Sequence, residues 1–375
     1  MAIARENLDT DSLDDGGLGA RSVEILLAGQ APSGALIASP TFPIYQFAWL
    51  RDGSFCARAL DAAGRTGAAE RFHRWVEQTL ATHRGQAEQL IAALDAGHVP
   101  PAADMLPARY ALDGRLEVPG AVKGEVWPNY QVDGYGSWLF ELASHVERGG
   151  SAAFDRDAVD LAARYIAAAW RADCYDCWEE FGDGQHASTL AAVAAGLDGA
   201  ARLLDAPAYA EQAATVRESL RTRFVRDGLV RKGAADDRLD ASLLWLAVPY
   251  RILEPSDPIM CATAEAIRAD LRGRTGGIHR YLGDTYYGGG EWILLTCWLG
   301  WYDAVTGNRP GFDAARDWVR KQTTPLLDLP EQSSDGAQEP QMIEPWVLRW
   351  GPVATPLLWS HAMYLLMLEA ALPWT

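Results

Sequence analysis

Two glutamates, far apart in the sequence, have surroundings that suit proton transfer. The first, Glu179, follows Trp178 and precedes Glu180 in a Cys-Trp-Glu-Glu-Phe run at residues 177–181. An indole beside a carboxyl group displaces water from it, and a neighbouring carboxylate disfavours ionisation, so we expect a raised pKa. Such a group keeps a proton available for a leaving group near neutral pH. A charged turn between two helices would carry the same residues.

The second glutamate, Glu331, lies in a Leu-Pro-Glu-Gln run at residues 329–332. Pro330 has a fixed φ and stiffens the backbone that leads to this carboxylate. Gln332 is placed to orient the carboxylate or a water molecule. An ordinary exposed loop acid would have the same sequence.

Three further clusters combine the residue types that bind a sugar ring. They lie at residues 49–52, 127–133 and 280–287 and contain Trp or Tyr with Arg, Asp or both. A guanidinium supplies a planar fork of donors, a carboxylate accepts hydrogen bonds, and an aromatic face stacks on C–H groups. Structural ion pairs, or a helix cap at 127–133, are the alternative explanations. With the two glutamates, these clusters predict a glycoside hydrolase site, inverting if the carboxyl groups lie about 6.5–9.5 Å apart and retaining near about 5 Å.

Signatures of other chemistries are absent from the sequence. It contains no GxxxxGK[ST], GxGxxG, HExxH, EF-hand or GxSxG pattern. The seven histidines show no metal-ligand spacing, and Cys174 and Cys177 form a single CxxC, so we expect structural thiols and no metal. A net charge of −17, with only three lysines, argues against nucleic acid as a partner.

No segment predicts a membrane span. Residues 1–15 contain no apolar signal-peptide core. The most apolar run, residues 292–301, is about half of the ~20 residues that a span requires. We therefore expect a soluble, cytoplasmic protein that has no membrane partner.

Helical periodicity dominates the chain, and alternating runs long enough for strands are scarce. About twelve helices are expected, at residues 17–27, 54–63, 65–80, 135–146, 157–172, 185–204, 207–224, 241–248, 263–271, 292–305, 312–321 and 357–372. The protein is therefore predicted to be all-α.

Two kinds of helix alternate along the chain. One kind has a single charged face, and the other is apolar nearly all round and must be buried on every side. The first kind covers 65–80, 157–172, 207–224 and 312–321, and the second covers 54–63, 187–196, 241–248, 292–301 and 357–367. This alternation predicts six outer–inner hairpins closed into one (α/α) toroid over residues 1–375, rather than two or three separate domains.

Four long segments between the predicted helices are rich in Gly, Pro and aromatic residues. They cover residues 37–52, 98–132, 273–290 and 328–356. Loops longer than about 12–15 residues are usually functional. In a toroid with short turns on one face, these loops would gather at the other face and form an aromatic-lined, acidic cleft.

At these residues the sequence resembles glycoside hydrolase family 15, the glucoamylase-type enzymes. The resemblance extends from about Tyr45 to Glu369. It rests on the order and spacing of Trp49-x-Arg51-Asp52-Gly53, Gln131-x-Asp133, Asp176-x-Trp178-Glu179-Glu180, Arg280-Tyr281-x-x-Asp284-x-Tyr286, Glu291-Trp292, Leu329-Pro330-Glu331-Gln332 and Thr355-Pro356-Leu357-x-Trp359-Ser360-His361. The family implies a six-hairpin toroid and inverting exo-hydrolysis that releases β-D-glucose from the non-reducing end of α-glucosides.

The resemblance also implies roles for individual residues. Glu179 would be the general acid, Glu331 the general base, and Glu180 would help to bind the sugar past the cleaved bond. Arg51 and Asp52 would hold the 4- and 6-hydroxyls of the terminal glucose. The other expected substrate contacts are Trp49, Trp127, Trp178, Arg280 and Asp284. This chemistry requires no metal or organic cofactor.

We base the expected size of the substrate on two domains that other family members carry. Many bacterial members carry a β-sandwich before the toroid, and fungal members often carry a starch-binding domain after it. Here only residues 1–48 precede Trp49, and the last helix reaches the end of the chain. We therefore expect a short α-glucoside with an α-1,6 or α-1,4 linkage, such as isomaltose. A trehalase, a starch glucoamylase, a sugar phosphorylase and a non-catalytic sugar-binding toroid are the alternatives.

Overall fold

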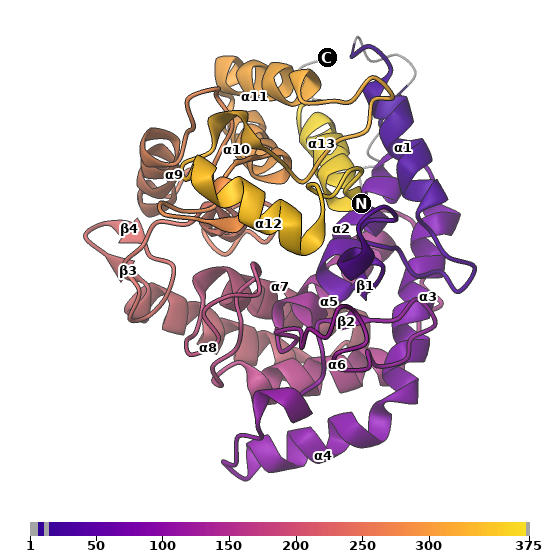
Figure 1. The fold of residues 1–375 in the computed structure, drawn as a ribbon. Coiled ribbons are helices and arrows are strands. Elements are labelled where there is room, and N and C mark those ends of the chain that lie inside the picture. Colours follow the sequence, from indigo (N-terminus) through magenta and orange to yellow (C-terminus); the bar gives the residue numbers. More distant parts are fainter. Residues whose placement is uncertain (1–6, 11–14, 373–375) are drawn as a thin grey trace.

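Six buried helices form a closed inner ring in the computed structural model, which describes residues 7–10 and 15–372. Each helix packs against the next, and the last returns to the first. They are α2 (Leu50–Ala62), α5 (Asp133–Glu147), α7 (Ala187–Leu204), the 3₁₀ helix η3 (Ala241–Leu246), α10 (Ile293–Thr306) and α13 (Leu358–Ala370). Figure 1 shows the sequence colours progressing around this ring, with α13 beside α1 and α2.

Six outer helices cover the inner ring. They are α1 (Leu18–Ala28), α3 (Thr66–Thr82), α6 (Arg156–Ala169), α8 (Pro207–Arg223), α9 (Pro258–Asp270) and α11 (Arg309–Lys321). The outer helix α11 buries only four of its residues, whereas the inner helix α10 buries every residue from Ile293 to Ala304. The predicted alternation of outer and inner helices, and the all-α six-hairpin toroid, are therefore confirmed.

Two glycines allow the inner helices α5 and α7 to touch backbone to backbone. A Cβ on Gly136 would lie 2.4 Å from the carbonyl oxygen of Ala192, and one on Gly196 would lie 2.5 Å from the carbonyl oxygen of Gly136. Only glycine fits at such a contact. The start of α5 is thus held close to the start of α7, and both ends carry residues of the site described below.

Short antiparallel pairs connect the long loops to one another. The strand β1 (Ala48–Trp49) pairs with β2 (Arg109–Tyr110), and β5 (Glu291–Trp292) pairs with β6 (Gln332–Ser333). The first pair joins two of the four loops that the sequence analysis singled out, and the second joins the loop at 328–356 to the residues directly after the loop at 273–290. A third pair, β3 (Val225–Arg226) with β4 (Leu229–Val230), lies after α8. Single 3₁₀ turns occur at η1 (Pro43–Tyr45), η2 (Ala102–Asp104), η4 (Tyr286–Gly288), η5 (Ser334–Gly336) and η6 (Pro340–Met342).

Three of the helix predictions need correction. The helix α4 (Arg84–Asp95) was missed, because it buries only Ala87, Leu90 and Ile91 and therefore shows a short apolar stripe. The helix α12 (Ile343–Trp350) lies inside a predicted loop; its proline is in the first turn, where a missing N–H costs nothing. Residues 241–248 form a 3₁₀ helix that ends at Leu246, because a residue before a proline such as Pro249 disfavours the α conformation.

Within the described residues, the helix α7 is long and apolar enough to cross a membrane when judged by length and composition alone. Its place in the inner ring accounts for this composition, since 78% of it is buried inside the molecule.

Candidate active site

A pocket of about 310 Å³ lies where the four long loops meet at one end of the inner ring. Every one of these loops contributes to its wall, together with the turn before α7. The side chains on the wall include Tyr45, Trp49, Arg51, Asp52, Glu125, Trp127, Trp178, Glu179, Glu180, Arg280, Tyr286, Trp292, Glu331, Trp346, Arg349, Trp350 and Trp359. The predicted aromatic-lined, acidic cleft is therefore confirmed, and it brings together both candidate catalytic glutamates.

Glu179 is presented by a tight turn between α6 and α7. Its φ of 67° is left-handed, a strained conformation for a residue with a side chain. The turn is held by Asp176, whose Oδ1 accepts hydrogen bonds from the N–H groups of Trp178 at 3.0 Å and Glu180 at 2.9 Å. The indole of Trp49 donates to Glu179 Oε1. The indole that contacts this carboxyl group through a hydrogen bond is thus that of Trp49, whereas the sequence suggested Trp178.

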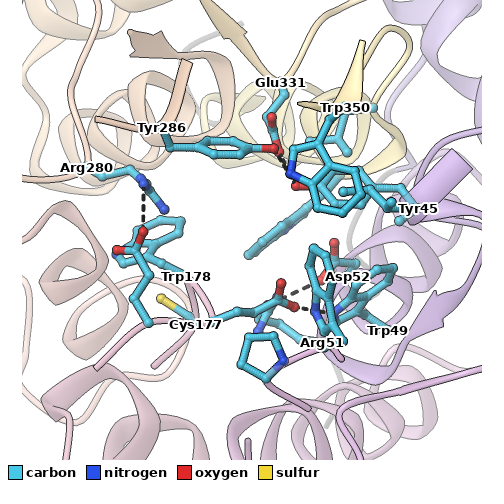
Figure 2. A pocket seen from close by; sticks show the side chains of 18 of the residues that line it. Tyr45, Trp49, Arg51, Asp52, Cys177, Trp178, Arg280, Tyr286, Glu331 and Trp350 are labelled. Atoms are coloured by element: carbon cyan, nitrogen blue, oxygen red, sulfur yellow. Dashed lines mark hydrogen bonds and ion pairs between the residues drawn. The ribbon is translucent and has the colours of Figure 1, made fainter. Parts of the chain in front are cut away.

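Glu331 enters the pocket from the segment that leads into β6. Its N–H donates to the carbonyl of Ala354 at 2.9 Å, and its own carbonyl accepts from Ile293 at 3.2 Å. The hydroxyl of Tyr45 donates to Glu331 Oε1 at 3.0 Å and lies 3.0 Å from the hydroxyl of Tyr286 (Figure 2). Oε2 is buried and has no hydrogen-bond partner among the residues that the structure describes, so it is available to a water molecule or a substrate.

The expectation that Gln332 orients Glu331 is wrong. The Gln332 side chain accepts a hydrogen bond from Gly290 N–H at 2.8 Å and donates to the carbonyl of Tyr286 at 3.3 Å. Successive residues of an extended chain point to opposite sides, so these two neighbours cannot both face the pocket. The hydroxyl groups of Tyr45 and Tyr286, and not the side chain of Gln332, therefore orient the Glu331 carboxylate.

Burial raises the proton affinity of both glutamates. Burial raises the pKa of Glu179, and the charges of Arg51 and Arg109 oppose this shift. Burial also raises the pKa of Glu331 to about 8, against the hydrogen bonds of the two tyrosines, and the charge of Glu179 raises it further. When one carboxyl group is ionised, the other therefore holds its proton more firmly, and a state with a single proton on the pair is favoured. General acid–base catalysis requires that state.

Arg51 and Asp52 come from the first turn of α2. The guanidinium of Arg51 donates to Gln131 Oε1 at 2.5 Å and to Asp133 Oδ2 at 3.2 Å, and its Nε lies 3.2 Å from Asp52 Oδ2. Its Cζ lies 5.0 Å from the ring centre of Trp359. Burial raises the pKa of Asp52 to about 7, although Arg51 opposes the shift. The pair forms a fixed set of donors and acceptors at the pocket wall.

Arg280 lies across the pocket, close to Trp178 (Figure 2). Its Nη2 donates to Glu180 Oε1 at 3.2 Å, and Glu180 Oε2 accepts from Tyr281 at 2.5 Å. Both oxygens of Asp284 accept from Arg280, at 2.6 and 2.7 Å. Asp284 is fully buried and does not line the pocket. It therefore orients Arg280, and the expectation that it contacts substrate needs this correction.

One aromatic wall is supported from behind by a buried arginine. The rings of Trp49 and Trp127 meet edge to face with centres 6.2 Å apart. The Cζ of Arg109 lies 4.8 Å from the Trp49 ring centre and 4.2 Å from that of Trp127, and the guanidinium is fixed by Glu117. Cations on aromatic faces stabilise such stacks by about 0.5–2 kcal/mol. The wall is therefore rigid before any ligand binds.

The helix α12 closes one side of the pocket mouth. Arg349 donates to Glu125 Oε1 at 2.8 Å, and its carbonyl accepts from Lys123 Nζ at 2.8 Å. This clasp joins α12 to the loop that carries Trp127, and it places Trp346 and Trp350 on the pocket wall.

Several site residues were not predicted from the sequence. Tyr45, Glu125, Trp346, Arg349 and Trp350 lie in the long loops, whose aromatic composition was the only available signal. Their positions depend on how the loops fold back over the ring, which no local pattern in the sequence reports.

A possible metal-binding cluster lies away from the pocket. Asp61, His73 and His145 are buried, with one ligand atom from each within 4.8 Å of the others. Zinc bonds of about 2.0–2.1 Å place neighbouring ligand atoms about 3.4 Å apart, so this spacing is loose. His145 Nδ1 already lies 2.7 Å from Asp61 Oδ2, which makes the cluster a hydrogen-bonded group. The cysteines of the CxxC, Cys174 and Cys177, are free and buried, as expected for structural thiols.

Comparison with known proteins agrees with this fold. Residues 19–324 match the family model "Glycosyl hydrolases family 15". The chain is 39% identical to the isomaltose glucohydrolase of Kribbella flavida over 94% of this chain and 92% of that protein. It is 25% identical to trehalase 2 of Sulfolobus acidocaldarius over 74% of this chain and 52% of that protein. A glycosidase structure solved in complex with glucose, as a glutamate-to-alanine variant, has a TM-score of 0.90 and 37% identity, covering 97% of this chain and 99% of that one.

The toroid and its paired-carboxylate pocket define a glycoside hydrolase. More particularly, the chain belongs to glycosyl hydrolases family 15.

The hydrogen bond from Tyr45 yields a test of the site's electrostatics. In Tyr45→Phe, Glu331 loses a donor that stabilises its ionised form, so its pKa should rise above the native value. A hydrogen bond to a charged group stabilises by about 1.5–3 kcal/mol, which corresponds to about one to two pKa units. Carbon-13 NMR titration of labelled glutamate carboxyls, with Glu331 assigned by comparison with Glu331→Gln, measures the shift. Tyr209→Phe, on an outer helix, is the matched control, and an unchanged or lower pKa in Tyr45→Phe would show that this bond does not act on the carboxylate.

Proposed function

We propose that the protein is an inverting, exo-acting glucosidase that releases β-D-glucose from the non-reducing end of short α-glucosides such as isomaltose. The observation that carries this proposal is the placement of Glu179 and Glu331 in one desolvated pocket, where burial raises the pKa of both. The name of the Kribbella flavida relative supports the choice of isomaltose. We also infer that the ring forms one catalytic domain.

In this proposal the two glutamates divide the proton transfers. Glu179 holds the proton and gives it to the glycosidic oxygen as the bond breaks. In the reactive form Glu331 is ionised, which its pKa of about 8 makes the minor form at neutral pH, and it takes a proton from the water molecule that attacks the anomeric carbon from the opposite face. Inversion requires room for that water between the carboxyl groups, a separation of about 6.5–9.5 Å. The free Oε2 of Glu331 supports its assignment as the base.

The terminal glucose would occupy the inner part of the pocket. Arg51 and Asp52 are buried there and ready to bind hydroxyl groups, and the indoles of Trp49, Trp127 and Trp178 can stack on the ring. Because these residues end the pocket, only a chain terminus can enter, which fits exo-action. The volume of about 310 Å³ is at the small end of the ligand-pocket range of about 300–1,000 Å³.

The mouth of the pocket would hold the sugar past the cleaved bond. Glu180, fixed by Arg280 and Tyr281, faces this region. The wall of α12 narrows it on one side, which favours a disaccharide over a polymer. The relationship to trehalase 2 keeps an α,α-1,1 linkage as a second candidate.

Water is favoured over phosphate as the attacking group. Each of the three arginines on the described pocket wall, Arg51, Arg280 and Arg349, is ion-paired with a carboxylate. An incoming phosphate would therefore have to compete with these pairs for a cation. A carboxylate such as Glu331 in direct reach of a phosphate would also repel it.

Removal of the proposed base should separate binding from turnover. In Glu331→Ala, kcat for isomaltose should fall by about 10²–10⁴-fold, the usual contribution of a general base. Glucose should still bind, because Arg51, Asp52 and the indoles are unchanged; calorimetry measures this. Glu265→Ala on the outer helix α9 is the control. Undiminished turnover in Glu331→Ala would remove the base assignment.

The clasp between α12 and the Trp127 loop yields a test of substrate length. In Arg349→Ala, the ratio of kcat/KM for isomaltotriose to that for isomaltose should rise, because the mouth loses the pair that holds one wall. An exposed pair stabilises by about 0–1 kcal/mol, so the ratio should change by up to about fivefold. Arg74→Ala, which breaks an exposed pair on α3, is the control.

Kinetics on isomaltose, maltose, trehalose and soluble starch place the protein within the family. We expect isomaltose to have the highest kcat/KM. If starch is preferred, or if Arg349→Ala leaves the length preference unchanged, the idea that α12 selects short substrates is wrong.

A further inference from the structure

A buried lysine lies behind the turn that presents Glu179. Lys232 is one of three lysines in the chain, and only 2% of it is exposed. It lies shortly after β4, between α8 and η3, and it is not part of the pocket wall. A buried ammonium group needs charged or hydrogen-bonding partners, because its desolvation is otherwise very costly.

Two aspartates supply those partners. The ammonium Nζ of Lys232 lies 2.6 Å from Asp176 Oδ2 and 2.5 Å from Asp240 Oδ2. Asp176 is 1% exposed and Asp240 is fully buried. The three side chains therefore form a buried triad in which one cation joins two carboxylates.

Both aspartates hold the residues that flank Glu179. The other oxygen of Asp176 accepts the N–H groups of Trp178 and Glu180, which surround Glu179 in the turn. Asp240 accepts the indole N–H of Trp178 at 3.0 and 3.1 Å. Asp176 thus holds the backbone of the turn, and Asp240 holds the side chain of Trp178. Lys232 connects the two aspartates.

The backbone of Lys232 is itself anchored. Its carbonyl accepts a hydrogen bond at 2.9 Å from the N–H of Ala187, the first residue of α7. Its N–H donates to the carbonyl of Arg238 at 3.0 Å. The ammonium also lies 4.8 Å from the ring centre of Phe181 and 5.1 Å from that of Tyr281. The cation therefore occupies one defined place relative to the helix that follows the turn.

The shifts in pKa of Lys232 and Asp240 both favour the charged forms. Burial alone would lower the pKa of Lys232, but the two aspartates outweigh it and raise the pKa. Burial alone would raise the pKa of Asp240, yet Lys232 and Ser242 lower it. Lys232 and Asp240 therefore stay ionised across the neutral range, so the cation that links the two aspartates persists.

We propose that Lys232 is a positioning residue for the general acid: it joins Asp176 to Asp240 and so holds Glu179, in its left-handed conformation, at the leaving-group oxygen. The proposal rests on the assignment of Glu179 as the acid. It explains how a strained residue keeps one orientation, since the aspartates that bind its neighbours on both sides are joined by one fixed cation.

A pair of substrates distinguishes this role from a general effect on folding. Isomaltose has a sugar alkoxide as leaving group and needs a proton from the acid. Fluoride, the leaving group of α-D-glucosyl fluoride, is a weak base and departs without that proton. In Lys232→Met, kcat for isomaltose should fall by about 10–100-fold, the usual cost of a misplaced catalytic group, while kcat for the fluoride changes little. Lys321→Met, on the exposed end of α11, should leave both unchanged.

A second variant keeps the test valid if Lys232→Met folds poorly. Lys232→Met combined with Asp240→Asn has the same net charge as the native triad, and the asparagine oxygen can still accept the Trp178 indole N–H. It lacks the ammonium link, so the isomaltose-to-fluoride ratio of kcat should remain lowered. A native ratio in whichever variant folds overturns the proposal.

The variant Glu179→Gln separates failure of this proposal from failure of the proposed function. If Glu179 is the acid, Glu179→Gln loses isomaltose turnover and keeps fluoride turnover. If it loses both or neither, the acid assignment is wrong. If Glu179→Gln separates the two substrates but Lys232→Met lowers both in parallel, the acid assignment stands and Lys232 has only a structural role.

Discussion

The rest of the structure depends on the desolvation of two glutamates in one pocket. A shift in the pKa of Glu331 from 4.5 to about 8 corresponds to a preference for the protonated form on the order of 5 kcal/mol. This exceeds the about 1.5–3 kcal/mol expected from a single hydrogen bond to a charged group, so the Tyr45 hydroxyl offsets only part of it. The cost of ionising both carboxyl groups and the repulsion between them favour a state with a single proton on the pair. The proposed reaction uses that proton.

The toroid supplies what such a pocket needs. The inner helices are mostly apolar and buried, so packing holds them in a closed ring. The long loops at one end of the ring then bring Glu179 and Glu331 together, although about 150 residues separate them in the chain. The short strand pairs and the contact of Gly136 with α7 fix the loops and helix ends to one another. Arg109, behind the wall, and Arg280, on the wall, are each neutralised by a carboxylate.

The sequence predicted those features of the fold and the site that produce a local pattern of residues. Helical periodicity and the alternation of apolar with amphipathic helices were enough for the toroid. Runs in which a carboxyl group lies beside an indole or a proline identified Glu179 and Glu331. The sequence could not show that Gln332 turns away from the pocket or that Asp284 lies behind Arg280, because both depend on side-chain direction.

Contacts between distant segments were also beyond the sequence. The indole that touches Glu179 comes from Trp49, and the tyrosine that bonds Glu331 comes from Tyr45, each more than 100 positions away. The helix α12 was not predicted, because a short segment that contains a proline resembles a loop. Lys232 gave no signal, since a lone lysine between two helices is usually exposed. Pairings of this kind arise only when the ring closes.

The central claim is that Glu331 activates a water molecule on the face of the sugar opposite to the bond that Glu179 protonates. Proton NMR of the first product released from isomaltose tests it most directly, because the anomeric signals of glucose are resolved before mutarotation mixes them. The account predicts that β-D-glucose appears first and that the α-anomer grows in later at the rate of mutarotation. Initial release of α-D-glucose would contradict it.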